Sequence, residues 1–349
     1  MKNGYLRPTC ISLFSGGGGM DIGIKAAGFD IKAATDAERL CQETFAENFP
    51  GIPFIVRRIG ELSTAELLDA AGLAPGEVDL LVGGPPCPSF SKSRFYRTEK
   101  PRALDDPVAK ETVGGYLRIL KESRPKAFLL ENVKGLAYGV HKEALDHIIN
   151  TANKLGYRTS VCLINAADYG VPQIRERCIV MGIKGRDPCP PLPTHSKNPD
   201  GFMLPWVTAG QVLNDLDSEE NASFEGHFAG GKHHDLLLQI PPGENYLFFT
   251  EERGHVEPQF KWRSRYWSFL LKLSKDLPSW TIQARRSNNM GPFHWRSRIL
   301  RISEIKRLQT FPDNYILSGN VEKQWRQIGN AVPPLVAEAF GKAIFNSIE

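Results

Sequence analysis

The sequence predicts an α/β fold with a mainly parallel sheet, joined to a second, smaller and irregular domain. Short apolar segments alternate with amphipathic segments through the first half of the chain. A glycine-rich run, residues 15–19, separates the first apolar segment from the first helical one. Beyond about residue 185 the periodicity weakens, and proline, tryptophan and histidine become frequent. Alternating strands and helices are typical of a parallel sheet covered by helices on both faces.

The expected elements follow one another in regular order along the first part. We expect strands at residues 9–14, 29–34, 77–82, 127–130, 159–165 and 178–183. Between them we expect helices at residues 20–27, 37–48, 110–122 and 142–155. Helical patterning returns at residues 299–311 and 334–348. We therefore expect a catalytic domain formed by residues 1–185 and completed by 298–349, with residues 186–297 inserted as a separate domain.

Composition limits the class of protein. With 349 residues and 41% hydrophobic residues, the chain can bury a full core. No apolar run is long enough to span a membrane, and no apolar signal segment opens the chain, so we expect a cytoplasmic protein. The net charge of +4 permits a nucleic-acid partner without arguing for one. No two of the six cysteines have zinc-ligand spacing, so we expect no metal.

The glycine-rich run is a candidate nucleotide site. A strand, a glycine turn and a helix present backbone N–H groups to a ligand. The pyrophosphate-binding pattern is not met, because Asp21 or Ile22 stands where its third glycine is required. Asp36 follows the second strand, where an acidic side chain can hydrogen-bond a ribose. This combination suits a nucleoside, and a tight structural turn is the alternative.

Reactive side chains follow two other strands. Cys87 lies just past one strand, in the segment 83–88, and Glu131 ends another. A thiol in a cleft can act as a nucleophile, and a carboxyl group can act as an acid or hydrogen-bond donor. The alternatives are an inert buried cysteine and a helix cap. Gln173, Arg175 and Arg177 alternate, so an extended segment turns them to one face, which can grip a phosphate or a base oxygen.

Taken together, these motifs resemble the DNA (cytosine-5) methyltransferase family, in family order and along nearly the whole chain. The segment 14–19 resembles the family's S-adenosylmethionine loop, Pro85-Pro86-Cys87 its nucleophile motif, and Glu131-Asn132-Val133 its pyrimidine-holding motif. Gln173-Ile174-Arg175-Glu176-Arg177 fits its Q-x-R-x-R pattern. Glu304 with residues 307–313, and residues 327–334, resemble its last two motifs.

The resemblance implies a Rossmann-like, S-adenosylmethionine-dependent methyltransferase with a small target-recognition domain at residues 186–297. It would methylate cytosine C5 in a specific double-stranded DNA sequence, by base flipping and a covalent bond from Cys87 to C6, and release S-adenosylhomocysteine. Glu131 would hold N3 of the base. Arg177, helped by Arg175, would contact O2 and a phosphate. The expected cofactor residues are Phe14, Ser15, Gly16, Gly18, Gly19, Met20, Asp36, Pro85, Asn330 and Val332.

DNA contacts are expected from two regions. The basic segment 89–106 follows Cys87, and we expect it to close over DNA. The expected DNA-binding residues are Ser89, Ser91, Lys92, Arg94, Gln173, Lys261, Arg263, Arg285 and Arg286. We expect Trp262, Trp267 and Trp280 to lie in the core of the small domain rather than to stack on bases.

Two positions depart from the family pattern. Arg58 stands where the family commonly has an aspartate that binds the adenine amino group, and arginine cannot accept a hydrogen bond. Ser303 precedes Glu304 where the family often has arginine, and we expect little effect there.

Two other functions compete with DNA methylation. An RNA cytosine-5 methyltransferase is disfavoured because its Cys-Phe-Thr signature is absent, and a catalytically silent binding module is disfavoured by the retained Cys87 and Glu131. The compact chain resembles prokaryotic or phage enzymes of restriction-modification systems. We expect a monomer that acts beside a cognate restriction or defence protein.

Overall fold

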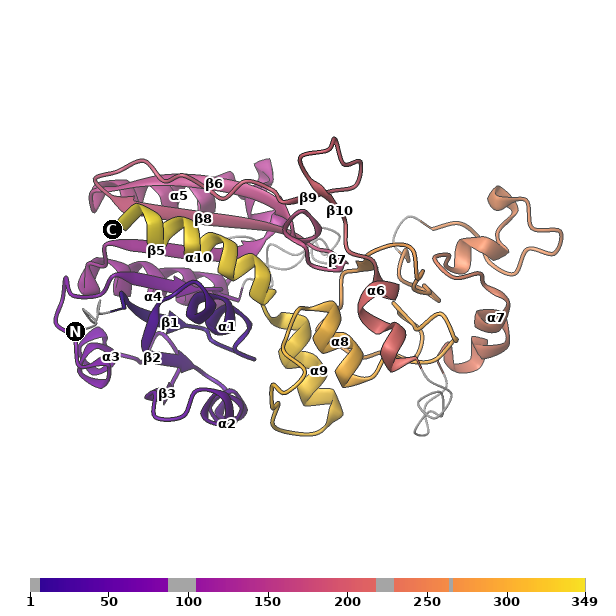
Figure 1. Ribbon diagram of the computed structural model, residues 1–349, viewed down its shortest axis with the longest axis horizontal. Helices are drawn as coiled ribbons and strands as arrows, with labels where there is room; N and C mark the ends of the chain where they lie inside the picture. Colours follow the sequence, from indigo (N-terminus) through magenta and orange to yellow (C-terminus); the bar gives the residue numbers. More distant parts are fainter. Residues whose placement is uncertain (1–6, 87–104, 218–228, 264–265, 349) are drawn as a thin grey trace.

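The protein is built on a seven-stranded sheet in the order β3-β2-β1-β4-β5-β8-β6 (Figure 1). The computed structural model describes residues 7–86, 105–217, 229–263 and 266–348. The strands of this sheet are β1 (Thr9–Leu13), β2 (Asp30–Asp36), β3 (Phe54–Val56), β4 (Leu80–Gly83), β5 (Ala127–Val133), β6 (Tyr157–Asn165) and β8 (Glu176–Lys184).

The first five strands are parallel to one another, and β8 runs antiparallel to both β5 and β6. The reversal has a simple cause. Only the short segment 166–175 joins β6 to β8, and a parallel return would need a long crossover such as a helix. The expectation of a mainly parallel sheet is confirmed.

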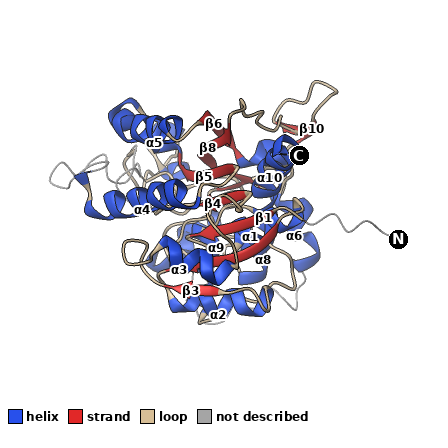
Figure 2. Cartoon of the chain, turned by 90° about the vertical axis from the view of Figure 1, so that its left-hand side faces the viewer, coloured by secondary structure: helices blue, strands red, loops and turns tan. Residues whose placement is uncertain are grey.

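Helices cover both faces of the sheet (Figure 2). One face packs against α1 (Gly19–Ala26), α2 (Arg39–Asn48) and α10 (Pro334–Ile348). The other packs against α3 (Thr64–Ala71), α4 (Pro107–Ser123) and α5 (Lys142–Lys154). Successive strand residues divide between the two cores, as in β5, where Leu129 belongs to one and Leu130 to the other. Strands buried on both faces explain the continuous apolar runs in the sequence.

Three of the elements at the large sheet and around it are not among those expected from the sequence. The strand β3 has only three residues, and α3 has eight. The helix α9 (Val321–Asn330) lies within a segment that the sequence identifies only as the family's last motif. Short elements carry too few turns for a periodic signal. The helix α8 (Ile302–Leu308) is also shorter than the expected 299–311.

The segment 185–301 contains only short elements. They are β9 (His195–Ser196), β10 (Leu204–Pro205), α6 (Ala209–Leu213), α7 (His234–Gln239) and β11 (Ser279–Trp280). In Figure 1, α8 and α9 lie between the large sheet and the region around α7. One buried apolar cluster runs through the large-sheet region and the segment 185–301. It includes Ile24 and Phe340 from the first and Leu237 and Phe249 from the second. No helix in the described ranges is long and apolar enough to cross a membrane.

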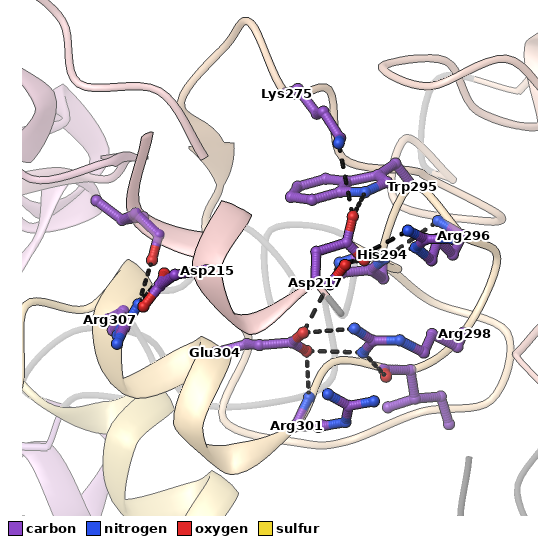
Figure 3. Close-up of polar contacts among 12 residues, drawn as sticks. Asp215, Asp217, Lys275, His294, Trp295, Arg296, Arg298, Arg301, Glu304 and Arg307 are labelled. Atoms are coloured by element: carbon purple, nitrogen blue, oxygen red, sulfur yellow. Dashed lines mark hydrogen bonds and ion pairs between the residues drawn. The ribbon is translucent and has the colours of Figure 1, made fainter. Parts of the chain in front are cut away.

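A buried charge network anchors the start of α8 (Figure 3). The carboxylate of Glu304 accepts the backbone N–H of Arg301 at 2.7 Å and both terminal nitrogens of Arg298 at 2.8 and 2.5 Å. His294 lies 3.7 Å from both Glu304 and Asp217, and burial together with the nearby Arg298 lowers its pKa to about 3. Its ring is therefore neutral at neutral pH. Arg298 thus supplies the partner of Glu304, which makes the departure at residue 303 harmless to this contact.

Candidate active site

A cavity of about 700 Å³ opens at the carboxyl ends of the parallel strands. Its lining comes from the segments that follow β1, β2, β3 and β4, from the end of β5, from the start of α4, and from residues 326–332. Ligands of open α/β sheets bind at this edge, and the volume suits a molecule of nucleoside size. The fold therefore brings the sequence motifs to one place although they are spread over the whole chain.

The glycine loop forms one wall of the cavity. The Ser15 hydroxyl donates to the Asp21 carboxylate at 2.6 Å, which fixes the loop to the first turn of α1. Gly18 has a φ of 79°, and a Cβ there would lie 2.1 Å from the Tyr315 hydroxyl. A Cβ on Gly19 would lie 2.3 Å from the carbonyl oxygen of Val332. These two glycines are required for close packing of the loop against the end of the chain.

Asp36, at the end of β2, supports the same loop. Its carboxylate accepts the backbone N–H of Gly16 at 3.0 Å and that of Glu38 at 3.0 Å. Burial raises the pKa of Asp36, and the two backbone hydrogen bonds oppose this effect. Each carboxylate oxygen keeps a second lone pair that can accept a hydrogen bond from a ligand hydroxyl.

The residues present fit the nucleoside part of S-adenosylmethionine. All the expected cofactor residues line the cavity except Gly18 and Gly19, which pack against Tyr315 and Val332 instead. Phe14, Ile59 and Val108 add apolar surface on which a purine ring can lie, and Asp36 is a hydrogen-bond acceptor for a ribose.

Arg58, which departs from the family pattern, pairs with Glu111 in the structure. Arg58 Nε donates to Glu111 Oε1 at 3.1 Å, and its Nη2 donates to Oε2 at 2.5 Å. Both residues line the cavity. Glu111 is not among the residues expected from the sequence, because it lies inside α4 and belongs to no motif. Only the three-dimensional contact between α4 and the loop after β3 reveals it.

Glu131 and Arg177 form an ion pair in the cavity. Arg177 Nε lies 2.7 Å from Glu131 Oε1, and both side chains are largely buried. Burial lowers the pKa of Arg177, while Glu131 opposes this effect. A Cβ on Gly84 would lie 3.2 Å from Glu131 Oε2, so the loop after β4 begins directly against this carboxylate.

The loop after β4 is tied down on both sides before it reaches Cys87. The Asn132 side chain donates to the Pro85 carbonyl oxygen at 3.1 Å. The Thr112 hydroxyl donates to the Pro86 carbonyl oxygen at 3.1 Å. Cys87 itself, with Ser89, Ser91, Lys92 and Arg94, lies outside the described residues.

Other cysteines near the sheet are poor nucleophiles. Cys41 lines the cavity, but burial raises the pKa of its thiol strongly. Burial raises the pKa of Cys178 to about 12 and also raises that of Cys162. These thiols stay protonated at neutral pH, and the thiolate is the reactive form.

Gln173 and Arg175 have buried partners within the protein, although Arg175 also lines the cavity, and their expected contacts with DNA or the base stay predictions. The Gln173 side chain donates to the Leu308 carbonyl oxygen at 3.1 Å and accepts the Ile282 N–H at 3.1 Å. The fully buried Arg175 guanidinium donates to the carbonyl oxygens of residues 282, 329 and 331, at 3.4, 2.9 and 3.0 Å. These side chains join β7 (Gln173–Ile174) to the segments beside it, and of the alternating residues only Arg177 pairs with Glu131.

The segment 185–301 is the second part of the chain, and the residues in it that we expected to contact DNA differ in exposure. Lys261, Arg263 and Arg285 are exposed. The Arg286 side chain is only 11% exposed and pairs with Glu322 at 3.2 Å. Arg286 is therefore less accessible to DNA than we expected.

The expectation for the tryptophans is wrong. Trp262, Trp267 and Trp280 are 54%, 47% and 37% exposed. Phe249, Phe293 and aliphatic residues fill the core of the second part instead.

A parallel sheet with one reversed strand, a glycine loop after β1, an acidic residue at the end of β2 and a carboxylate near the end of β5 define a Rossmann-like methyltransferase. A family model for the C-5 cytosine-specific DNA methylases matches residues 8–346, and the chain belongs to this family. It is a DNA cytosine-5 methyltransferase.

Relatives and one solved structure agree with this assignment. The chain is 38% identical to the Type II methyltransferase M.SacI of Streptomyces achromogenes, over 97% of this chain and 93% of that protein. It is 30% identical to the Type II methyltransferase M.XorII of Xanthomonas oryzae pv. oryzae, over 98% and 85% of the two chains. The solved structure of the Entamoeba histolytica methyltransferase EhMeth has a TM-score of 0.65 at 18% identity and covers 99% of both chains, so it shows the shared fold.

Proposed function

We propose that this enzyme transfers the methyl group of S-adenosylmethionine to C5 of a flipped-out cytosine in a specific double-stranded DNA sequence, as the modification enzyme of a restriction-modification system. The observation that carries the proposal is the Glu131–Arg177 pair, which lies against the start of the loop that leads to Cys87. The family membership and the Type II relatives support the choice of DNA and of a modification role.

The chemistry follows from the weak nucleophilicity of cytosine C5. The Cys87 thiolate adds to C6, which breaks the aromatic ring and places electron density on C5. Glu131 supplies a proton or hydrogen bond to N3 and regains the proton when the ring is restored, and Arg177 contacts O2, so the developing negative charge is stabilised. When bound, S-adenosylmethionine supplies the methyl group that C5 accepts. Loss of the C5 proton and expulsion of Cys87 then restore the aromatic ring and the free thiol.

The target base must leave the double helix to reach these residues. Arg177 and Glu131 are largely buried at the sheet edge, whereas a paired base is stacked inside the duplex. We assign recognition of the surrounding sequence to residues 186–297, where the exposed Lys261, Arg263 and Arg285 offer cations to DNA phosphates. The enzyme acts as a monomer in this proposal.

The test is 5-methylcytosine sequencing of plasmid DNA and RNA from a host without cytosine methylation. The wild-type protein should methylate DNA in one fixed sequence context, and Cys87→Ser should abolish this methylation. Cys189→Ser is the control, because Cys189 is exposed and lies outside the cavity lining, and it should behave as wild type. Methylation by Cys87→Ser would contradict the covalent mechanism. Methylated RNA without methylated DNA would replace the DNA substrate by an RNA one.

A further inference from the structure

The cavity contains one carboxylate that the proposed reaction leaves without a task. Among the described residues, its acidic lining consists of Asp36, Glu38, Glu111 and Glu131. Asp36 holds the glycine loop, Glu38 pairs with Arg326, and Glu131 pairs with Arg177. Glu111 pairs with Arg58, and it lines the cavity together with the apolar side chains of Ile59 and Val108.

The Glu111 carboxylate is held from the loop after β3. Arg58 donates two hydrogen bonds to it, one to each oxygen. The backbone of Gly60 also approaches it closely, since a Cβ on Gly60 would lie 3.0 Å from Glu111 Oε1. The hydrogen bond from Arg58 lowers the pKa of Glu111, so the group is a carboxylate at neutral pH.

Counting acceptor positions shows what this carboxylate can still do. An ionised carboxylate accepts about four hydrogen bonds and donates none. Arg58 occupies two positions, one on each oxygen. A remaining position can accept a hydrogen bond from a donor at the edge of a flat ring that lies on Ile59 and Val108.

We propose that Glu111 recognises the exocyclic amino group of the adenine ring of the cofactor and that Arg58 is its positioning residue. The inference rests on the proposed function, because it assumes an adenosyl cofactor in this cavity. A carboxylate at the ring edge attracts an amino donor and repels a carbonyl oxygen. Glu111 therefore selects adenine against a purine that has oxygen or hydrogen at the same ring position.

The experiment is calorimetric titration of the purified full-length protein without DNA. The three ligands are S-adenosylhomocysteine, its analogue with a carbonyl oxygen in place of the amino group, and its analogue with hydrogen there. The wild type should prefer the adenosyl ligand to both analogues by a factor of about 10 or more, since a hydrogen bond to a charged group is worth about 1.5–3 kcal/mol. In Glu111→Ala and Glu111→Gln, the ratio of the affinities for the adenosyl ligand and for the hydrogen analogue should fall toward 1.

Two further variants test the division of roles. Arg58→Ala should reduce the preference without abolishing it, because Glu111 stays in α4 but loses the two hydrogen bonds that hold its carboxylate. Arg58→Lys should restore part of the preference, because lysine can still donate to the carboxylate. Glu66→Ala is the matched control. Glu66 pairs with the neighbouring Arg57 at 3.3 Å but does not line the cavity. This variant should keep the wild-type preference.

Each outcome separates the two hypotheses. A preference that survives in Glu111→Ala overturns the role of Glu111, and so does an equal loss of affinity for all three ligands, which would indicate a structural role. If the wild type binds none of the ligands, the cofactor of the proposed function fails as well. Thermal unfolding of Glu111→Gln, expected to match wild type, checks that the variant is folded.

Discussion

The pair of Glu131 and Arg177 shows how much depends on single side chains. In the proposed reaction Glu131 holds N3 of the base, and Arg177 Nε lies 2.7 Å from Glu131 Oε1. We expect Glu131→Gln to lower kcat by about 10²–10⁴-fold, the usual contribution of a positioned acid or base, while DNA affinity stays close to wild type. Single-turnover methylation and a DNA-binding assay measure these two quantities separately.

Glu176→Gln is the control for this prediction. Glu176 neighbours Arg177 in the chain but is exposed and pairs with Lys134. Its replacement should leave kcat within a few-fold of wild type. An unchanged kcat in Glu131→Gln would remove Glu131 from the proposed chemistry.

Because Asp21 is buried, we expect the free energy of unfolding to depend on pH. Burial raises its pKa from 3.8 to about 6, although the Ser15 hydroxyl donates to it. The folded state therefore binds this proton more tightly than the unfolded state, so stability falls as the pH rises from about 4 to about 6, by about 1.4 kcal/mol per unit of pKa shift. Asp21→Asn cannot ionise and should lose this decline.

Chemical denaturation at pH 4.5 and pH 7.5 checks the expectation for Asp21. Between these two values, the wild type should lose free energy of unfolding relative to Asp21→Asn. Equal pH dependence of the two proteins would show that the Asp21 carboxylate is as well stabilised as in water.

At the scale of residues, the sequence motifs predicted most of the side chains at the site, and the contacts in the structure added others and refined the roles of some. Asp36 and Glu131 were predictable because each lies near the carboxyl end of a strand at the ligand-binding edge. Arg177 was predictable from its alternation with Gln173 and Arg175. Glu111 was not, because a carboxylate on one helix turn carries no signal of the loop that it faces. Gln173 and Arg175 matched the motif, but burial and their carbonyl partners turned them inward.

The helix α8 shows how an element depends on a buried ion pair. Glu304 is fully buried, caps the helix through the Arg301 N–H, and binds Arg298 with both oxygens. Glu304→Ala leaves Arg298 as a buried charge without its carboxylate, which should cost about 3–5 kcal/mol of unfolding free energy. Denaturant unfolding measures this loss.

Glu322→Ala is the comparison for α8. Glu322 belongs to α9, is 59% exposed at its side chain and pairs with Arg286. Exposed pairs contribute about 0–1 kcal/mol, so this variant should stay near the wild-type stability. If Glu304→Ala were equally mild, the network in Figure 3 would not be what anchors α8.

Length explains which elements the sequence predicted. Helices such as α4 and α5 are long enough to show periodic burial, and the buried strands show apolar runs. The strand β3 and the pieces between residues 185 and 301 are too short for either signal. The exposed tryptophans of the second part illustrate the same limit, since residue type alone does not decide burial.

At the scale of the whole molecule, the second part should supply the electrostatic share of DNA affinity. Replacing the exposed Lys261 and Arg285 by glutamate should weaken binding at low salt. It should also flatten the dependence of log K on log salt by about 0.9 for each DNA phosphate that the variant no longer neutralises. Binding titrations at several salt concentrations measure both effects.

Lys154→Glu is the control for charge alone, because Lys154 is exposed on α5, outside the second part. It should change affinity and salt slope much less. An equal effect of the two changes would mean that net charge, rather than the position of the cations, controls DNA binding.

The contact between the glycine loop and the end of the chain also governs when the enzyme becomes active. Gly19 lies against Val332, and the Thr44 hydroxyl donates to Gln327, 283 residues further along. Such distant partners meet late, because the chain between them must order first. A nascent chain still attached to the ribosome at residue 300 lacks one wall of its cavity, because residues 326–332 line it. Each molecule can therefore begin to modify DNA only after these residues have been synthesised.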